Sequence, residues 1–296
     1  MNNNNTISRK VFMAFNFFIL ALATLLCLFP ILHILALSFS EGWTVQSGMV
    51  GIWPVKFTLK AYEFVASTSE FAKAFFVSLE RVFLGVPVNI ILTVLIAYPL
   101  SKKKTEFRYR NIYAWFFIIT MMFNGGMIPT YVVVYKAGLI NSIWALIIPG
   151  AVQVFNVIIM FNFFRELPGE IEESAFIDGA SYWRSLWSIY IPLSKPVMAT
   201  VLLFCLIAHW NSWFDGILYI NRPEKYPLQS YLQTVVIQVD LKVSANMQEN
   251  MAALAVITQR NTKAAKIFLA MIPILAVYPF IQKYFTTGIV LGSVKG

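Results

Sequence analysis

Apolar residues form long uninterrupted runs along this 296-residue chain. A helix needs about 20 apolar residues to cross the hydrocarbon core of a bilayer. Six runs come close to this length or exceed it without any aspartate, glutamate, lysine or arginine, and they cover residues 11–40, 82–101, 111–135, 137–164, 196–214 and 267–282. A soluble core helix is rarely so long and so uniformly apolar. The pattern therefore predicts an all-α polytopic membrane protein with about six transmembrane helices.

The loops between these runs suggest one transmembrane domain that covers residues 1–296. The first run is longer than the apolar part of a signal peptide, and no small-x-small cleavage site follows it, so we interpret it as a retained helix. We expect two long segments, 41–71 and 217–263, on the extracytoplasmic side of the membrane, and the segment 166–195 on the cytoplasmic side. With allowance for helix ends, the predicted spans are roughly 11–38, 79–101, 111–135, 142–165, 196–216 and 264–284.

Composition supports a protein in lipid. The chain is 58% hydrophobic and 12% charged, and a soluble domain carries roughly twice that charged fraction. Its 26 Phe, 13 Tyr and 8 Trp suit a lipid-facing surface with aromatic belts. Cys27 and Cys205 both lie inside apolar runs, so we expect buried small side chains rather than a disulfide or a metal pair.

Charge indicates an orientation. The net charge of +9 comes without a basic stripe interleaved with exposed aromatic residues, which disfavours nucleic-acid binding. Counting all basic residues hardly separates the two orientations, but the positive-inside rule is weighted to short loops near helix ends. The largest basic cluster follows the second run directly, so we place it in the cytoplasm, with both termini on the same side. It consists of Lys102, Lys103, Lys104, Arg108 and Arg110.

The most charged cytoplasmic stretch is 165–195, which reads RELPGEIEESAFIDGASYWRSLWSIYIPLSK. Pro168 suits a first helical turn, and the glutamates after it complement the positive end of the helix dipole. Gly179 can end this helix in a left-handed conformation. Ser181 can cap a second helix, which Pro192 stops. The stretch therefore predicts two helices joined by a sharp turn at the membrane surface.

The same stretch has the spacing E-A-A-x3-G-x9-I-x-L-P. It departs from this motif at Ser174, in place of the first alanine, and at Ile191, in place of leucine. On this motif the chain resembles the permeases of binding-protein-dependent ABC importers, and the resemblance implies the type I importer permease fold. The matching positions are Glu173, Ser174, Ala175, Gly179, Ile189, Ile191 and Pro192, and Asp178 and Ala180 complete a D-G-A triplet.

The resemblance implies roles for parts of the chain. In the family this stretch is a coupling helix that docks in a groove of an ATP-hydrolysing subunit. The implied contact residues are Glu173, Ser174, Ala175, Asp178, Gly179, Ala180, Ile189 and Pro192. The C-terminal tail inserts between the ATPase subunits in maltose-type systems, which implies contacts from Gly292, Ser293 and Lys295.

The resemblance also implies a multisubunit assembly in the cytoplasmic membrane of a prokaryote. Its other members are a second, different permease, two ATP-binding subunits and an extracytoplasmic solute-binding protein. ATP and Mg²⁺ bind to the partner subunits, so this chain needs no cofactor of its own and is not an enzyme.

Three further stretches indicate the cargo. NGGMIPTY (residues 124–131), WNSWFD (residues 210–215) and the ending YPFIQKYFTTGIVLGSVKG resemble the second six-helix subunit of maltose-type carbohydrate permeases. Within these, they resemble a subgroup for complex or acidic oligosaccharides. We therefore expect an oligosaccharide substrate, with a peptide, polyamine or phosphonate as alternatives.

Polar side chains inside spans are costly and tend to face the bundle interior. Those in the predicted spans are candidates for the substrate pathway, and tryptophans beside them offer flat stacking surfaces. Each has an alternative role in helix packing. With two histidines in the chain and no ligand pair at a suitable spacing, we expect no metal site. The candidates are Asn124, Asn156, His209, Trp210, Asn211, Trp213 and Asp215.

Two other classes of function fit less well. A secondary transporter predicts internal repeats or intramembrane charge pairs, and the sequence has no evident repeat and almost no charge within its spans. A membrane-embedded enzyme predicts a catalytic motif such as HExxH, which is absent from the sequence. Neither class explains the motif at residues 173–192.

Overall fold

The computed structural model describes residues 7–235 and 251–293. Apart from one isolated β-bridge between Ser40 and Phe57, the regular elements it describes are helices, which confirms the all-α prediction. In chain order they are α1 (Ile7–Ser38), α2 (Gly42–Gln46), α3 (Lys60–Ser67), α4 (Ser69–Ser101), α5 (Arg110–Met122), α6 (Met127–Lys136), η1 (Ile143–Leu146), η2 (Ile148–Gly150), α7 (Val154–Glu166), α8 (Gly169–Ile177), α9 (Tyr182–Ser185), η3 (Leu186–Tyr190), α10 (Ile191–Leu193), α11 (Lys195–Asn211), α12 (Phe214–Tyr219), η4 (Pro223–Lys225) and α14 (Met251–Ser293).

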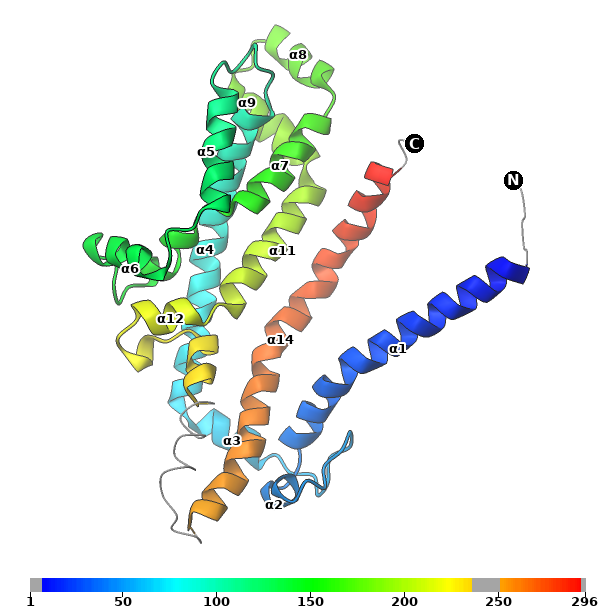
Figure 1. Cartoon of the computed structure of the whole chain (residues 1–296), viewed down its shortest axis with the longest axis vertical. Helices are drawn as coiled ribbons and strands as arrows, with labels where there is room; N and C mark the ends of the chain where they lie inside the picture. The colour runs from blue at the N-terminus through cyan, green and yellow to red at the C-terminus, as the bar shows by residue number, and fades with distance from the viewer. Residues whose placement is uncertain (1–6, 236–250, 294–296) are drawn as a thin grey trace. The chain divides into compact units, whose positions relative to one another are not determined.

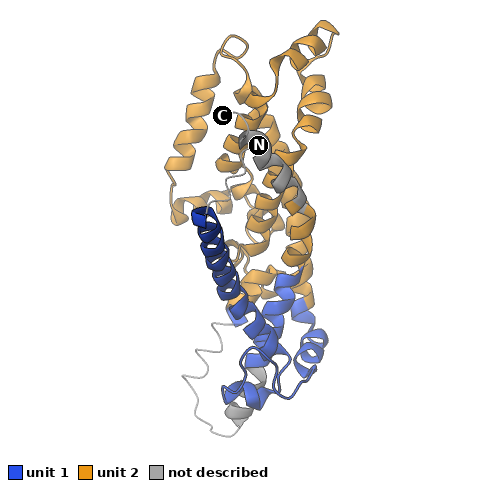
Figure 2. Ribbon diagram, turned by 90° about the vertical axis from the view of Figure 1, so that its right-hand side faces the viewer, with its two compact units in different colours: residues 1–71, 234–272 blue, residues 72–233, 273–296 orange. Residues whose placement is uncertain are grey.

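The chain divides into two compact units, which Figure 2 colours separately. Unit 1 consists of residues 1–71 and 234–272, and unit 2 consists of residues 72–233 and 273–296.

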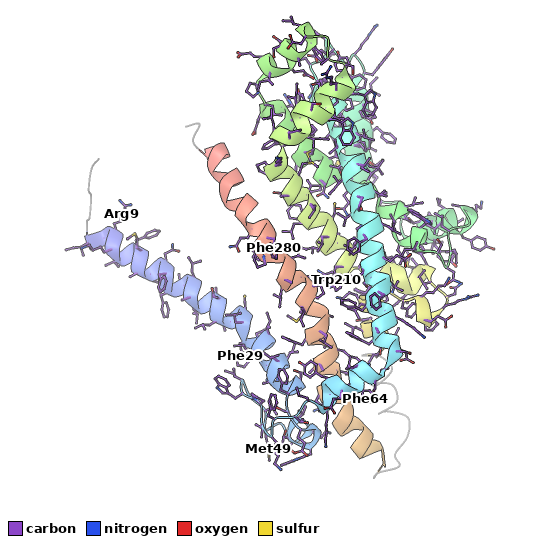
Figure 3. The ribbon with its side chains drawn as sticks, turned by 180° about the vertical axis from the view of Figure 1, so that it is seen from behind. Arg9, Phe29, Met49, Phe64, Trp210 and Phe280 are labelled. Carbon is purple, nitrogen blue, oxygen red and sulfur yellow. The ribbon has the colours of Figure 1, made fainter. Side chains whose placement is uncertain are left out.

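In unit 1, α1 is 32 residues long, which gives about 48 Å of helix, more than the thickness of a hydrocarbon core. Its side chains point outward all around it, Phe29 among them (Figure 3), and its most apolar stretch has no buried residue. Cys27 is accordingly exposed, and the expectation that it is buried is wrong. The loop after α1 is better packed, because Ser40 is buried and its Oγ accepts a hydrogen bond from the Val55 N–H at 3.0 Å.

Among the described residues, three helices are long and apolar enough to cross a membrane: α1, α4 and residues 260–280 of α14. They contain most of the predicted spans 11–38, 79–101 and 264–284. The helices around the last two are longer than predicted, because α4 begins at Ser69 and α14 at Met251. Three bent helix pairs raise the number of candidate spans in the described residues to as many as six.

The structure divides the third predicted span, 111–135, into α5 and α6, which meet at a bend of 115°. The break has a local cause. Gly126 takes a left-handed φ of 88°, and its N–H donates to the side-chain oxygen of Asn124 at 2.9 Å. At 13 residues, α5 is only about 20 Å long. The continuous helix expected from hydropathy is therefore replaced by two shorter helices.

Helix breaks also alter the next two predicted spans. Range 142–165 begins as η1 and η2 and continues as α7 after a bend of 50°. In range 196–216, α11 ends at Asn211 and α12 begins at Phe214. Hydropathy does not detect these breaks because it averages side chains over a window and does not register a change of backbone direction.

The core of unit 2 lies where α4, α7 and α11 pack together, and Figure 1 shows these helices running beside one another. Small and flexible apolar side chains fill the contact, including the fully buried Ala97, Met160 and Val201. Cys205 is also fully buried there, as predicted, and its Sγ lies 3.4 Å from the amide nitrogen of Asn156. This core fixes α4 against the helices on either side of the motif.

The motif segment forms the predicted pair of helices with a sharp turn between them. Gly179 has a φ of 79°, and the Ala180 N–H donates to the Ala175 carbonyl at 2.9 Å, closing α8. The Ser181 hydroxyl caps α9 by accepting the Arg184 N–H at 3.3 Å. Pro192, however, does not stop the second helix. It lies within α10, which the π-helical turn η3 joins to α9, and the helical run bends by 84° before α11.

Candidate functional site

Two clusters of buried and half-buried polar side chains lie along α4 in unit 2. We name them after their charged residues. The Glu172 cluster consists of Tyr98, Lys102, Glu172, Ser185 and Tyr190, and the Arg81 cluster consists of Arg81, Asn89, His209, Ser212 and Asp215.

In the Glu172 cluster, the carboxylate of Glu172 in α8 accepts hydrogen bonds from four side chains. Lys102, just after α4, forms an ion pair with Glu172 Oε1. The same oxygen accepts the Tyr98 hydroxyl at 2.8 Å and the Ser185 hydroxyl at 3.1 Å. The other oxygen accepts the Tyr190 hydroxyl at 2.8 Å. Glu172 therefore joins α8 to α4 and to the helical run after the turn.

Aromatic rings surround the cation of this cluster. Lys102 Nζ lies 4.0 Å from the centroid of the Tyr98 ring and 4.4 Å from that of Tyr190, so it makes cation–π contacts with both. The two rings meet edge to face with centroids 4.9 Å apart. Lys102 and Glu172 are 6% and 8% exposed. A buried ion pair needs such additional partners to offset the loss of its hydration.

The pKa of Glu172 reflects this balance. Burial on its own raises the pKa of the carboxyl group, but the hydrogen bonds from Lys102, Tyr190 and Tyr98 together with the charge of Lys102 outweigh it and hold the pKa below its ordinary value. The carboxylate form is therefore the one that the cluster stabilises.

The predicted motif glutamate, Glu173, is placed differently. It is exposed, and its carboxylate lies 3.9 Å from the ammonium of Lys103, which is also exposed. A pair in water contributes little to stability. Glu172 was missed because it stands one position before the motif. The available signal was the i, i+4 pair Tyr98 and Lys102, which places a hydroxyl and a cation on one helix face.

The other predicted coupling residues differ in their exposure. Ala175, Ala180 and Ile189 are half-buried. The remaining ones are exposed, as is Ile177, which is 86% exposed. These exposed residues are Glu173, Ser174, Asp178, Gly179 and Pro192.

In the Arg81 cluster, Arg81 of α4 is 3% exposed. It forms an ion pair with Asp215 of α12 through Nη2, and Nη1 donates to the same carboxylate at 3.2 Å. It also donates to the backbone carbonyls of Leu146 at 3.2 Å and Ser212 at 3.5 Å. Arg81 Nε donates to His209 Nδ1 at 3.3 Å.

His209 connects Arg81 to Asn89 through hydrogen bonds at its two ring nitrogens. Because Nδ1 accepts a hydrogen bond from Arg81, the neutral ring carries its proton on Nε2, which donates to Asn89 Oδ1 at 2.6 Å. The Asn89 amide in turn donates to the carbonyls of Gly150 and Ala151, each at 2.9 Å. The cluster therefore joins α4 to two helix breaks, the one around η1 and η2 and the one between α11 and α12.

The structure brings two of the seven predicted pathway residues, His209 and Asp215, into this cluster. Asn156 and Trp210 are buried elsewhere, and Trp210, labelled in Figure 3, packs edge-on against Phe75 with ring centroids 5.8 Å apart. The other three, Asn124, Asn211 and Trp213, are exposed.

Sequence reasoning overlooked Arg81 and Asn89. The uncharged run begins at Val82, directly after the arginine, so Arg81 falls at the edge of a span. The available signal was spacing, because Arg81, Gly85 and Asn89 follow each other at intervals of four on one face of α4.

The predicted tail contacts are located only in part. Gly292 and Ser293 lie in the last turn of α14, and Lys295 lies outside the described residues. Across the part of the chain that the structure describes, no group of three or more His, Cys, Asp and Glu side chains could hold a metal ion.

Two relatives from Bacillus subtilis (strain 168) resemble this chain over nearly its whole length. Protein LplC is 42% identical over 294 residues, which are 99% of this chain and 98% of the relative. The polygalacturonan/rhamnogalacturonan transport system permease protein YtcP is 40% identical over 280 residues, which are 94% of this chain and 96% of the relative.

A solved structure has the same fold. It is that of a bacterial ABC transporter involved in the import of the acidic polysaccharide alginate. It matches with a TM-score of 0.84 and 33% identity, and the match covers 96% of this chain and 100% of that chain.

The family model for the inner-membrane component of binding-protein-dependent transport systems matches residues 64–291. This agrees with the motif and with the fold, and it confirms the resemblance expected from the sequence. The chain therefore belongs to this family, as a multi-pass permease of an ABC importer that carries no cofactor and catalyses no reaction itself.

Proposed function

We propose that this permease imports an oligosaccharide, and that the sugar carries carboxylate groups. The observation that carries the proposal is the 40% identity, over nearly the whole of both chains, to a permease named for polygalacturonan and rhamnogalacturonan. The similarity to a transporter of acidic alginate supports the same class of cargo. The alternative is a non-sugar solute such as a peptide or polyamine.

The experiment that tests the cargo is uptake by the complete transporter, reconstituted in vesicles with its binding protein. Trigalacturonate is the probe, and maltotriose, a neutral sugar of equal length, is the control. We expect ATP-dependent uptake of trigalacturonate that exceeds uptake of maltotriose at least tenfold. Equal uptake of the two sugars would contradict the proposal that the cargo is acidic. Uptake of a peptide but of neither sugar would contradict the proposal that the cargo is an oligosaccharide.

Segment 166–195 is the part of the permease that couples it to ATP hydrolysis. The exposed outer surface of α8 and its turn supports this role, because it leaves Glu173, Ser174, Asp178 and Gly179 accessible to a partner. The Glu172 cluster supports it as well, because it attaches the segment to α4. The full set of coupling residues is Glu173, Ser174, Ala175, Asp178, Gly179, Ala180, Ile189 and Pro192.

The working assembly contains a second, different permease, two ATP-binding subunits and an extracytoplasmic binding protein. Family membership implies the ATPase and the binding protein. Both termini lie in the cytoplasm, which the basic cluster after α4 supports. The C-terminal residues Gly292, Ser293 and Lys295 contact the ATPase subunits. The chain is one permease domain with spans near 11–38, 79–101, 111–135, 142–165, 196–216 and 264–284.

Substrate contact is best supported for the candidates that the fold leaves exposed, namely Asn124, Asn211 and Trp213. His209 and Asp215 are instead engaged by α4. An amide can hydrogen-bond sugar hydroxyls, and an indole ring can stack on the flat apolar face of a sugar.

A further inference from the structure

Two helix breaks in unit 2 leave backbone carbonyls without helical partners. One lies around η1 and η2, before α7, and the other lies between α11 and α12. The last carbonyls of any helix need other donors. Leaving such groups unpaired is costly wherever water cannot reach them. Side chains from a neighbouring helix are one way to supply the donors.

Arg81 supplies donors to both breaks. A guanidinium group has five N–H bonds in a fixed planar arrangement. Here all five have acceptors: two on the Asp215 carboxylate, one each on the carbonyls of Leu146 and Ser212, and one on His209 Nδ1. Because no donor is left over, Arg81 cannot bind a substrate carboxylate without releasing one of these partners.

Asn89, two turns further along α4, completes a second connection. Its amide donates to the carbonyls of Gly150 and Ala151, and its oxygen accepts from His209. The break near η2 and the end of α11 are therefore joined through side chains of one helix face.

The close approach of α4 to His209 depends on Gly85, which lies one turn from both Arg81 and Asn89. A Cβ atom added at Gly85 would stand 2.5 Å from His209 Nε2, too close for any side chain. The cluster and the glycine together indicate that this face of α4 is shaped to hold the two breaks.

We propose that Arg81 is a positioning residue for transport. It holds α12 and the η1–η2 segment against α4, and in this way it sets the geometry of the chain beside the exposed candidates Asn211 and Trp213. The inference rests on the proposed function as a transporting permease, and it assigns Arg81 no direct contact with substrate.

The test uses the complete reconstituted transporter, with uptake of trigalacturonate and ATP hydrolysis measured on the same vesicles. Arg81→Lys keeps the charge, but its three donors on one nitrogen cannot reach all the acceptors. We expect at least a tenfold fall in sugar molecules imported per ATP hydrolysed. Glu80→Gln, on the exposed neighbouring position, is the matched control and should leave this ratio unchanged.

The number of sugar molecules imported per ATP hydrolysed distinguishes a positioning role of Arg81 from a merely structural one. A variant that only lowers the amount of folded protein reduces uptake and ATP hydrolysis in proportion, so an unchanged ratio in Arg81→Lys would overturn the proposal. If Arg81→Lys fails to assemble, Asp215→Asn provides the same measurement, because it weakens the same ion pair while retaining one acceptor oxygen.

A double variant tests the ion pair itself. Arg81→Gln leaves the Asp215 carboxylate without its cation, whereas Arg81→Gln with Asp215→Asn removes both charges and allows the two amides to pair. We expect the double variant to recover at least threefold in the import ratio relative to Arg81→Gln. A double variant no better than the single one would show that Arg81 does not act through Asp215.

The experiment also separates this inference from the proposed function. If wild-type vesicles hydrolyse ATP but import no oligosaccharide, the proposed cargo fails. Uptake of a peptide or a polyamine, the alternative cargoes, then gives the number of solute molecules imported per ATP hydrolysed. If wild-type vesicles import the sugar and Arg81→Lys does so at the same ratio, only the positioning role fails.

Discussion

Two ion pairs at different heights along α4 are held in different ways. Twenty-one positions separate Arg81 from Lys102, which corresponds to about 30 Å of helix, close to the thickness of a hydrocarbon core. At the Lys102 end, the partner Glu172 belongs to α8 of the motif segment. At Arg81, inside the helix, the partner Asp215 belongs to α12, the short helix after a break.

The surroundings of the two pairs differ more than their chemistry. The Glu172 carboxylate is 10% exposed at the side chain and is held by side chains alone: one ammonium and three hydroxyl groups. The Asp215 side chain is 23% exposed, and it also accepts the Gly216 N–H at 2.9 Å and the Ser212 hydroxyl at 2.7 Å. Water and the two local hydrogen bonds can therefore replace part of the stabilisation that the Asp215 carboxylate receives from Arg81. The Glu172 carboxylate has no comparable replacement for Lys102 nearby.

The largest effect is expected from Glu172→Ala. It leaves the Lys102 ammonium buried without its counter-ion, which costs about 3–5 kcal/mol when a buried pair is broken from one side. We expect α8 to detach from α4, so that hydrogen exchange of residues 169–177 accelerates by more than a hundredfold and uptake is lost. Glu173→Ala, at the exposed neighbouring position, should leave that exchange rate unchanged. Equal effects of the two variants would refute the special role of the buried carboxylate.

Asp215→Ala should have the second largest effect. Arg81 keeps its bonds to two carbonyls and to His209, and water reaches the vacated position, so we expect a loss of about 2 kcal/mol in the free energy of unfolding. Thermal unfolding of the purified permease in detergent measures it, with the exposed Asp178→Ala as control. A larger loss than that of Glu172→Ala would reverse the comparison between the two clusters.

Gly85→Ala tests the close packing beside the Arg81 cluster. The new methyl group would overlap the His209 ring, and overpacking of this kind costs about 1–3 kcal/mol. The unfolding midpoint in detergent should fall accordingly. Gly51→Ala meets no atom within 4 Å and is the matched control. A stability equal to that of the wild type would mean that His209 can move aside without loss.

The smallest effect concerns pH. Because the folded pKa of Glu172 lies below its ordinary value, the carboxylate stabilises the fold fully above that ordinary value, and the stabilisation is lost as the pH falls through the lower folded pKa. We expect the exchange protection of residues 169–177 to decline in acid below about pH 4. Glu172→Gln should have weaker protection near neutral pH and no such decline, and an unchanged acid profile in this variant would exclude Glu172 as its origin.

Particular elements show how far sequence reasoning reached. The spans within α1, α4 and α14 were predictable, because exposing such long apolar runs to water is unfavourable. The turn at Gly179 was predictable from its neighbours, because a left-handed residue after a helix favours glycine. The break at Asn124–Gly126 was not recognised, since hydropathy sums side chains and does not register a backbone turn.

The candidate site was also predictable only in part. Its place after the fourth predicted span and its relation to the importer family followed from a motif whose spacing is local to one segment. Which glutamate is buried did not follow. Glu172 and Glu173 are adjacent and chemically identical, and only the position of α8 over Lys102 and Tyr98 distinguishes them.

By itself, then, the sequence determined the class of protein, its membrane helices and the segment that marks its family, because these depend on apolar length and on local spacing. The tertiary structure alone decided that Glu172 joins the segment to α4, that Arg81 holds two helix breaks, and that His209 and Asp215 belong to that cluster. These contacts connect residues 65 to 134 positions apart, so they arise only when the helices pack.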